Sequence, residues 1–313
     1  MPSRARDDAL SEVVGFVLIL GVLVIVMSLY QLYVVPAQGR EDEIAHLNTI
    51  KDQFVDTKTS MDSLWINNQS GITISTSYQL GTLGGYSSGG GITMPLLSPI
   101  GSTARIALNM RESNLQRVEN FTITTSATSA PGNYPINFTM GKLAYISDNN
   151  YWIQQTYYYQ MGGVFLKQDD GITARVSPAL SIYKVGDSRA TIRMAAIALR
   201  GGGEIGGGTP VRVDTRLMEM PAYKAANSDV EWVNLTVDVA NREYAEAWLK
   251  VFNDTIHHGN IPNNWWKFGI SGDGTRGQAY VNITGSPDVS TNDIHLYVTR
   301  ADFAVYLQNV AGV

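Results

Sequence analysis

One apolar run close to the N-terminus constrains this chain more than any other feature. It covers residues 13–35 and reads VVGFVLILGVLVIVMSLYQLYVV. Within it, only Ser28 and Gln31 carry strong side-chain hydrogen-bonding groups, and both lie near its C-terminal end. At about 1.5 Å per residue, a helix of about 23 residues is about 35 Å long, enough to cross a hydrocarbon core of about 30 Å. We therefore expect a single membrane-spanning helix over residues 10–36.

The residues on either side of the run indicate its orientation. Arg4 and Arg6 precede it, whereas Arg40 and the acidic residues 41–43 follow it. Basic residues are enriched on the cytoplasmic side of membrane spans. The balance of two arginines against one predicts a cytoplasmic N-terminus and an extracellular remainder, in a single-pass protein of the cell membrane.

The length of the run argues against an ordinary secretory signal, whose apolar core has about 7–15 residues. Two alternatives are left. The run is an uncleaved single-pass anchor, or cleavage ahead of it leaves the run at a new N-terminus.

The second alternative gains weight from a short motif. Asp8-Ala9, then residues 10–15 (LSEVVG) and the aliphatic tract resemble the N-termini of archaeal type IV pilin-like proteins, in which a prepilin peptidase removes a short polar leader. The resemblance covers about residues 4–65. It implies a leader over residues 1–9, cleavage between Ala9 and Leu10, and contact with a pilus assembly machinery. This chain has Glu12 where many members have proline, and Arg4-Ala5 is a competing cleavage site.

Glu12 has two interpretations. The resemblance implies that its carboxylate pairs with the free amine of a neighbouring subunit and sets the register between subunits, because an unpaired charge in an apolar environment is costly. In the pilins where this pairing is described the glutamate is the fifth mature residue, whereas cleavage after Ala9 makes Glu12 the third. Alternatively, Glu12 is an interfacial residue in the first helical turn, where acidic side chains suit the helix dipole. The residues expected to form the membrane or filament-core helix include Val13, Gly15, Phe16, Leu20, Val24, Tyr30 and Pro36.

A second helix is expected over residues 37–66. Pro36 lacks a backbone N–H and, with Gly39, should kink or end the first helix. An amphipathic pattern follows, which predicts a stem helix that rests on the head or on an adjacent copy. Its apolar stripe consists of Ile44, Leu47, Ile50, Phe54, Met61 and Leu64, with Thr57 completing it. Its polar face carries Asp42, His46, Lys51, Asp52 and Lys58.

The remainder, residues 67–313, reads as a β-rich extracellular head. Short alternating runs such as 72–78 (ITISTSY) and 294–299 (IHLYVT) are separated by Gly, Pro, Asn and Asp. This pattern predicts an α+β protein whose head resembles an antiparallel sandwich, with one helix over residues 242–253. Residues 169–171 and 271–274 read as turns.

Two glycine-rich stretches, 81–91 and 201–208, lack the Lys-Ser/Thr ending of a phosphate-binding loop. We expect both to be loops between strands. The second marks either a boundary between two subdomains of the head or a long hairpin.

Little in the sequence points to catalysis, a metal or a cofactor. A net charge of −5 makes nucleic acid an unsuitable partner, and the absence of cysteine excludes thiolate chemistry and disulfides. Adjacent His257 and His258 should point apart, and His46 should be solvated on the stem. We therefore expect no enzyme, no bound metal and no cofactor. Neither HExxH nor GxSxG occurs, and no local motif marks an acid/base pair among the 28 acidic residues.

Aromatic clusters occur at residues 151–152, 157–159 and 265–266. Such rings stack on sugars, but they also build strand cores, and we favour the core.

Six Asn-x-Ser/Thr sequons follow the apolar run, on the side expected to be extracellular. The glycosylation candidates are Asn68, Asn120, Asn137, Asn234, Asn253 and Asn282.

The sequence thus predicts a structural, type IV pilin-like surface protein that anchors in the membrane or self-associates through its N-terminal helix. One alternative is a single-pass adhesin or binding protein of the cell envelope that does not polymerise. A third class, an anchored hydrolase, would require acidic side chains that converge in a cleft of the head.

Overall fold

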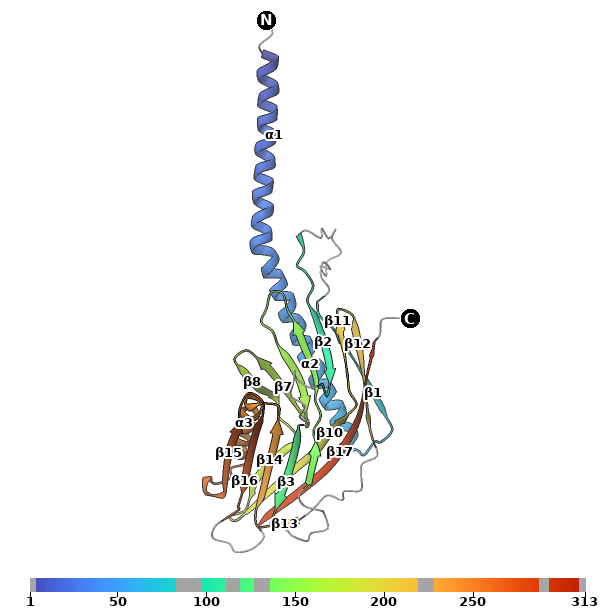
Figure 1. Ribbon diagram of the computed structural model, residues 1–313, viewed down its shortest axis with the longest axis vertical. Helices are drawn as coiled ribbons and strands as arrows, with labels where there is room; N and C mark the ends of the chain where they lie inside the picture. Colours follow the sequence, from blue (N-terminus) through green and yellow to red (C-terminus); the bar gives the residue numbers. More distant parts are fainter. Residues whose placement is uncertain are drawn as a thin grey trace.

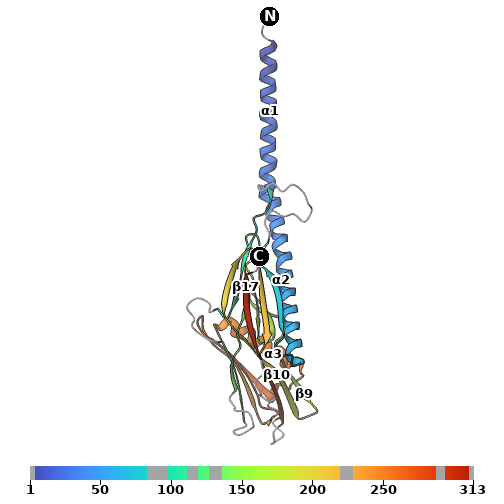
Figure 2. The same cartoon turned by 90° about the vertical axis from the view of Figure 1, so that its right-hand side faces the viewer.

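The computed structural model describes residues 4–82, 97–110, 119–126, 136–218, 228–286 and 293–309, of which residues 4–12 and Ser228 are described by their backbone alone. A long helix projects from a β-rich head (Figure 1). The second half of the helix runs along one side of the head (Figure 2). The predicted α+β class, with an apolar N-terminal helix ahead of several sheets, is confirmed.

The helix is continuous from Arg4 to Ile66. It consists of α1 (Arg4–Leu29), a π-helical turn (Tyr30–Val34) and α2 (Val35–Ile66). Pro36 does not end the helix, because it lies at the very start of α2 with the π-helical turn directly ahead of it. A wider turn relieves the contact between a proline ring and the preceding turn, and it absorbs the missing N–H. A bend between α1 and α2 is visible at this point (Figure 1).

The described strands of the head form three sheets. The first sheet contains, in spatial order, β1 (Thr73–Gln79), β12 (Pro210–Leu217), β17 (Ile294–Asn309), β10 (Arg189–Arg200) and β9 (Leu180–Val185), and β13 (Ser228–Val230) also pairs with β17. The second contains β11 (Gly203–Gly207), β2 (Thr103–Leu108), β5 (Leu143–Asp148), β6 (Thr156–Gln160), β7 (Gly163–Gln168) and β8 (Gly171–Val176). The third contains β15 (Trp266–Gly272), β16 (Gly277–Ile283), β14 (Val233–Val239), β3 (Asn120–Thr125) and β4 (Ile136–Thr139).

The long strands β10 and β17 join two hydrophobic cores. They pair in parallel, from Ala190 opposite Ile294 to Arg200 opposite Ala304, whereas the other described strand pairs are antiparallel. Their first halves contribute to a core with α3 (Arg242–His258), and their second halves contribute to a core with α2. Side chains alternate between the faces of a strand, and the two halves bury opposite faces: 294, 296 and 298 in one core, 301, 303 and 305 in the other.

The second sheet lies between these cores. Tyr157 and Tyr159 of β6 face the core with α2, whereas Tyr158 faces the core with α3. Trp265, in a short 3-10 helix (Asn263–Trp265), is also buried. The interpretation of these aromatic residues as core is therefore confirmed. The predicted helix at 242–253 is confirmed as α3, which extends to His258 and begins where the Asn241 side chain accepts a hydrogen bond from the Tyr244 N–H.

The stem helix α2 packs on the head through the predicted stripe. Leu47, Ile50, Phe54, Met61 and Leu64 are all buried. The hydroxyl of Thr57, also buried, lies 2.7 Å from that of Tyr78 on β1. Ile44 is only half-buried, because the neighbouring Glu43 takes the position that faces the head.

The expectation of a loop over residues 201–208 was wrong. Residues Gly203–Gly207 form the strand β11, which pairs with β2 at the edge of the second sheet. Backbone pairing does not need side chains, so a glycine-rich segment can serve as an edge strand. The other glycine-rich stretch lies outside the described residues from position 83 to position 91.

Substituting Phe54 with Ala should destabilise the head by about 3–5 kcal/mol, because its ring is fully buried against Tyr78 and Tyr157. Chemical unfolding of the full chain in detergent micelles measures this. The matched control is Phe16→Ala, which removes the same ring from a side chain 67% exposed on α1. Equal effects of the two substitutions would contradict the packing of α2 on the head.

Candidate functional site

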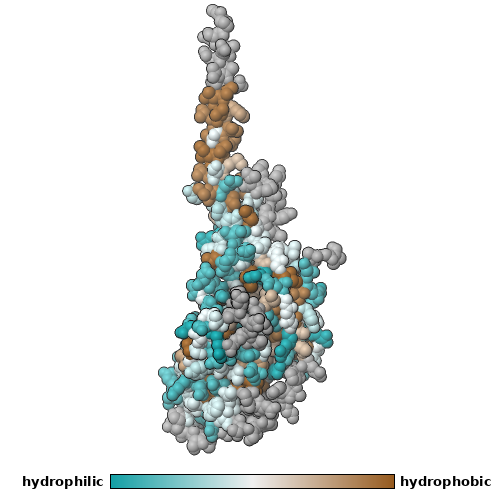
Figure 3. Space-filling view, in the orientation of Figure 1, coloured by the Kyte–Doolittle hydropathy of each residue, from teal (hydrophilic) through white to brown (hydrophobic). Residues whose placement is uncertain are grey.

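The most distinctive surface is the apolar segment of the helix, residues 13–34. The part of the chain that the structure describes contains one helix long and apolar enough to span a membrane, and no residue of its most apolar window is buried. Phe16, Leu20 and Val24 are 67%, 51% and 57% exposed. This segment forms a continuous brown band that stands clear of the head (Figure 3). An apolar surface of this extent needs a non-aqueous cover, from lipid or from other helices.

The polar groups within the segment are compatible with an environment of lipid or other helices. No charged residue occurs between Val13 and Gly39. The Ser28 hydroxyl donates to the backbone carbonyl of Val24 at 2.7 Å, so this hydroxyl has a partner within the helix itself. Polar groups with an internal partner cost little in an apolar environment.

On α2, C-terminal to the apolar segment, Glu43 joins the stem to the head through hydrogen bonds. Its carboxylate is 1% exposed and accepts three backbone N–H bonds from the turn between β5 and β6. One oxygen accepts from Asn150 at 2.7 Å, and the other accepts from Tyr151 at 2.9 Å and from Trp152 at 2.7 Å. Three donors that converge on one carboxylate compensate for the burial of its charge.

The side chains of the same turn also contact the stem. The Tyr151 ring lies against Gly39, where an added Cβ would collide with it. The Arg40 guanidinium lies over the Trp152 ring, 4.3 Å from its centroid. The aromatic pair at residues 151–152 therefore belongs to the junction between stem and head, which we define as Gly39, Arg40, Glu43 and residues 150–152.

His46 extends this contact by one helical turn, and the expectation that it is solvated was wrong. Its ring is half-buried, and its Nε2 shares a 2.8 Å hydrogen bond with the Tyr145 hydroxyl. That hydroxyl also accepts from the backbone N–H of Gly81 at 3.2 Å. Burial lowers the pKa of His46, and this effect outweighs a backbone hydrogen bond to Gln79 that raises it.

The structure places the other predicted residues as follows. Asp8, Ala9, Leu10 and Glu12 lie in α1, and their side chains are outside the described residues. Val13, Phe16, Leu20 and Val24 are exposed, whereas Gly15, Tyr30 and Pro36 are half-buried.

The remaining histidines do not form a site. His257 and His258 are exposed in the last turn of α3. His295 pairs with Asp229 across β17 and β13. Within the described ranges, no group of three or more His, Cys, Asp or Glu side chains could hold a metal ion.

Four of the six sequon asparagines lie on neighbouring strands of the third sheet, on the face opposite its buried side chains. They are Asn120, Asn137, Asn234 and Asn282. Asn68 is exposed in the turn after α2, and Asn253 is half-buried on α3. Asn137, on the edge strand β4, and Asn68 are the most accessible, whereas the Asn282 side-chain oxygen is buried.

Glu43 was missed in the sequence, although its spacing could have revealed it. The residues at positions 43, 47, 50, 54, 57, 61 and 64 alternate steps of four and three, and all are buried. A carboxylate at such a position is a sign of a buried polar contact rather than of a solvated face.

Comparisons with known proteins do not extend this description. A scan against protein-family models, a search of curated proteins and a search of solved structures each find no match. The apolar segment and the junction are therefore the features of this chain that bear most on its function.

Substituting Glu43 with Gln should destabilise the docked stem by about 2 kcal/mol. An amide offers one acceptor oxygen, and its NH₂ group would oppose the N–H donors of the turn. Chemical unfolding of the full chain in micelles measures the effect. Glu41→Gln, at an exposed position one half-turn away, is the matched control. If both variants unfold like the unsubstituted chain, the carboxylate does not hold the stem.

The stem contact should also weaken in mild acid. His46 has a lowered pKa in the folded chain and the ordinary value of 6.5 when unfolded, so the unfolded chain binds more protons. The stability contributed by neutral His46 is therefore complete above pH 6.5 and is lost as the pH falls through this value towards the lowered pKa. Unfolding measured from pH 7.5 to pH 5.5 should show a smaller loss in His46→Gln than in the unsubstituted chain. His257→Gln, at an exposed position, should leave the loss unchanged, and an identical loss in His46→Gln would contradict the assignment.

Proposed function

We propose that this chain is a non-catalytic, structural surface protein that is held by its N-terminal helix and displays its β-rich head outside the cell. The observation that carries the proposal is the uncovered apolar segment of residues 13–34. The cover is the lipid bilayer before assembly, and the helices of neighbouring copies in a filament core afterwards. This is the arrangement implied by the resemblance to archaeal type IV pilin-like proteins.

The junction supports a display role. Because α1, the π-helical turn and α2 form one continuous helix, the apolar segment and the head are joined without a flexible linker. Glu43 and the aromatic rings of the turn at 150–152 fix the head against the stem between two and three helical turns beyond the apolar segment. A head held in this way has a defined orientation relative to the membrane or filament.

The extracellular location agrees with the distribution of polar features. The basic residues Arg4 and Arg6 lie ahead of the apolar segment, and the six sequons lie beyond it. Because their side chains are exposed, Asn68 and Asn137 are the best placed of the six for glycan attachment.

The alternative is an anchor that never polymerises, with a head that acts as a binding module. Both functions need the same membrane helix, but they differ at the N-terminus. Cleavage between Ala9 and Leu10 belongs to the pilin-like route, whereas retention of Arg4 and Arg6 belongs to the permanent anchor.

The proposal predicts that the full chain stays in the membrane fraction after alkaline carbonate extraction. Leu20→Arg should reduce this membrane retention, because an arginine near the middle of a span costs about 2.5–3.5 kcal/mol for insertion. Leu20→Ala is the control, with retention like that of the unsubstituted chain. Recovery of the unsubstituted chain in the soluble fraction would contradict the proposal.

Mass spectrometry of the N-terminal peptide from the same membranes separates the two routes. A mature chain that begins at Leu10 supports the pilin-like subunit, and a chain that retains Arg4 and Arg6 supports the permanent anchor.

A further inference from the structure

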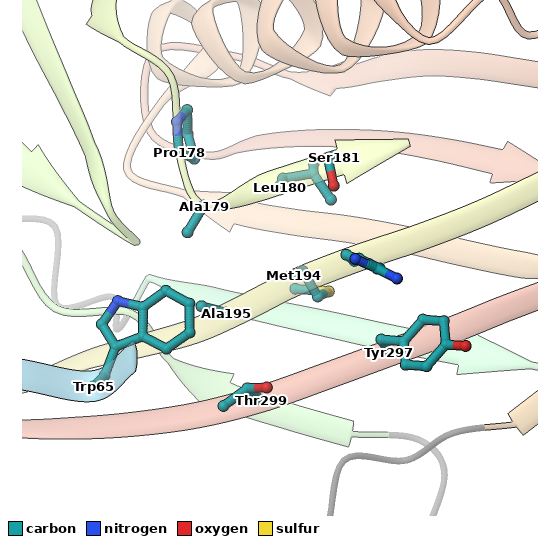
Figure 4. Close-up of a pocket in the computed structure, with 10 residues that line it drawn as sticks. Trp65, Pro178, Ala179, Leu180, Ser181, Met194, Ala195, Tyr297 and Thr299 are labelled. Carbon is teal, nitrogen blue, oxygen red and sulfur yellow. The ribbon is translucent and has the colours of Figure 1, made fainter. Parts of the chain in front are cut away.

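The head carries a groove at the end of α2 that is farthest from the apolar segment. It has a volume of about 520 Å³, and its lining comes from α2, β9, β10 and β17. Volumes of about 300–1,000 Å³ are typical of small-molecule sites. Figure 4 shows Trp65 at one side of the groove and Tyr297 at the other, with Leu180 and Met194 between them.

The groove results from the way in which β10 and β17 change their buried face. In their second halves, Ala195 and Ala301 belong to the face that α2 covers. The helix ends at Ile66, so no described helix covers the same face over the first halves of the strands. Arg193 lies there, directly opposite both Ser181 of β9 and Tyr297 of β17. The site therefore faces outwards on the part of the head that is remote from the membrane helix.

The lining combines three kinds of group. Trp65 and Tyr297 offer flat apolar rings, and Ala195 supplies a further apolar contact on the same face of β10. Ser181 and Thr299 offer hydroxyl groups. Arg193 supplies one positive charge, with its guanidinium 5.1 Å from the Tyr297 ring centroid and 5.9 Å from the Tyr183 ring centroid.

Arg193 is the most informative of these residues. Its side chain is exposed, and among the described residues no carboxylate lies within ion-pair distance of it. Its nearest acidic neighbour by strand register, Asp229, is two residues further along the sheet and pairs with His295. A planar cation that rests between aromatic rings and has no carboxylate partner within the described part of the chain suits bidentate binding of a carboxylate.

We propose that this groove binds an acidic glycan through a uronic-acid unit. A pyranose ring has an apolar C–H face that packs on Trp65 or Tyr297, hydroxyl groups that hydrogen-bond with Ser181 and Thr299, and a carboxylate that pairs with Arg193. A neutral glycan would leave the Arg193 charge without a partner. The net charge of the chain is −5, so the attraction is local to Arg193 rather than a property of the whole surface.

This inference is independent of how the chain is anchored or assembled. It also differs from the sugar-stacking role considered for the aromatic clusters at 157–159 and 265–266, because those residues belong to the core.

The test is calorimetric titration of the full chain, in lipid nanodiscs, with tetragalacturonate and with tetramannuronate. We expect binding of at least one acid. We also expect about tenfold weaker binding of the corresponding methyl ester, the change that about 1.4 kcal/mol produces. Arg193→Gln should weaken binding of the acid about tenfold and leave the ester unchanged. Tyr297→Ala should weaken both probes.

Tyr306→Ala is the matched control, because Tyr306 lies on the same strand, is 58% exposed and is outside the groove. It should bind both probes like the unsubstituted chain. Equal binding of acid and ester, an equal loss in Tyr306→Ala, or no binding of either acid would overturn the proposal. A change of oligomeric state in Arg193→Gln without glycan binding would instead identify the groove as an interface between copies. Membrane retention of each variant, measured in parallel, keeps this outcome separate from the test of anchoring.

Discussion

The apolar surface of residues 13–34 remains exposed after the chain has folded, and the stem and head are arranged around this fact. No residue of the most apolar window is buried, so the folding of a single chain leaves this segment exposed. Burial of apolar surface is the main favourable contribution to folding and association. For residues 13–34, such burial requires contacts from outside the chain. In the function proposed above, lipid or other helices supply this burial by surrounding α1.

This constraint explains why the stem and head are built as they are. The position of the head relative to the covered segment depends on one continuous helix and on the junction around Glu43. A carboxylate that accepts three backbone N–H bonds at 2.7–2.9 Å fixes the orientation of its turn relative to the stem, because hydrogen bonds are directional. Farther from the apolar segment, the same helix closes one core of the head through Phe54 and Met61 and ends at the groove. One continuous helix therefore carries the apolar segment, connects it to the head and closes one core of the head.

Local patterns predicted the elements that depend on local spacing. The apolar run, the stripe from Leu47 to Leu64 and the helix α3 followed from periodicity, and the β-rich head followed from short alternating runs. The contacts that were missed join residues far apart in the chain. Glu43 meets a turn 107–109 residues away, His46 meets Tyr145 at a separation of 99, and β10 pairs with β17 in parallel. The glycine-rich strand β11 was missed because its pairing uses backbone groups alone.

Chemical labelling in native membranes can measure whether the apolar segment is covered. The chain contains no cysteine, so each introduced thiol reports on one position. Leu20→Cys and Val24→Cys should resist a membrane-impermeant maleimide, because lipid or neighbouring helices cover these side chains. Asp52→Cys, on the exposed face of the stem, should react rapidly. Rapid labelling of all three positions would show that the apolar helix faces water, and it would contradict the account.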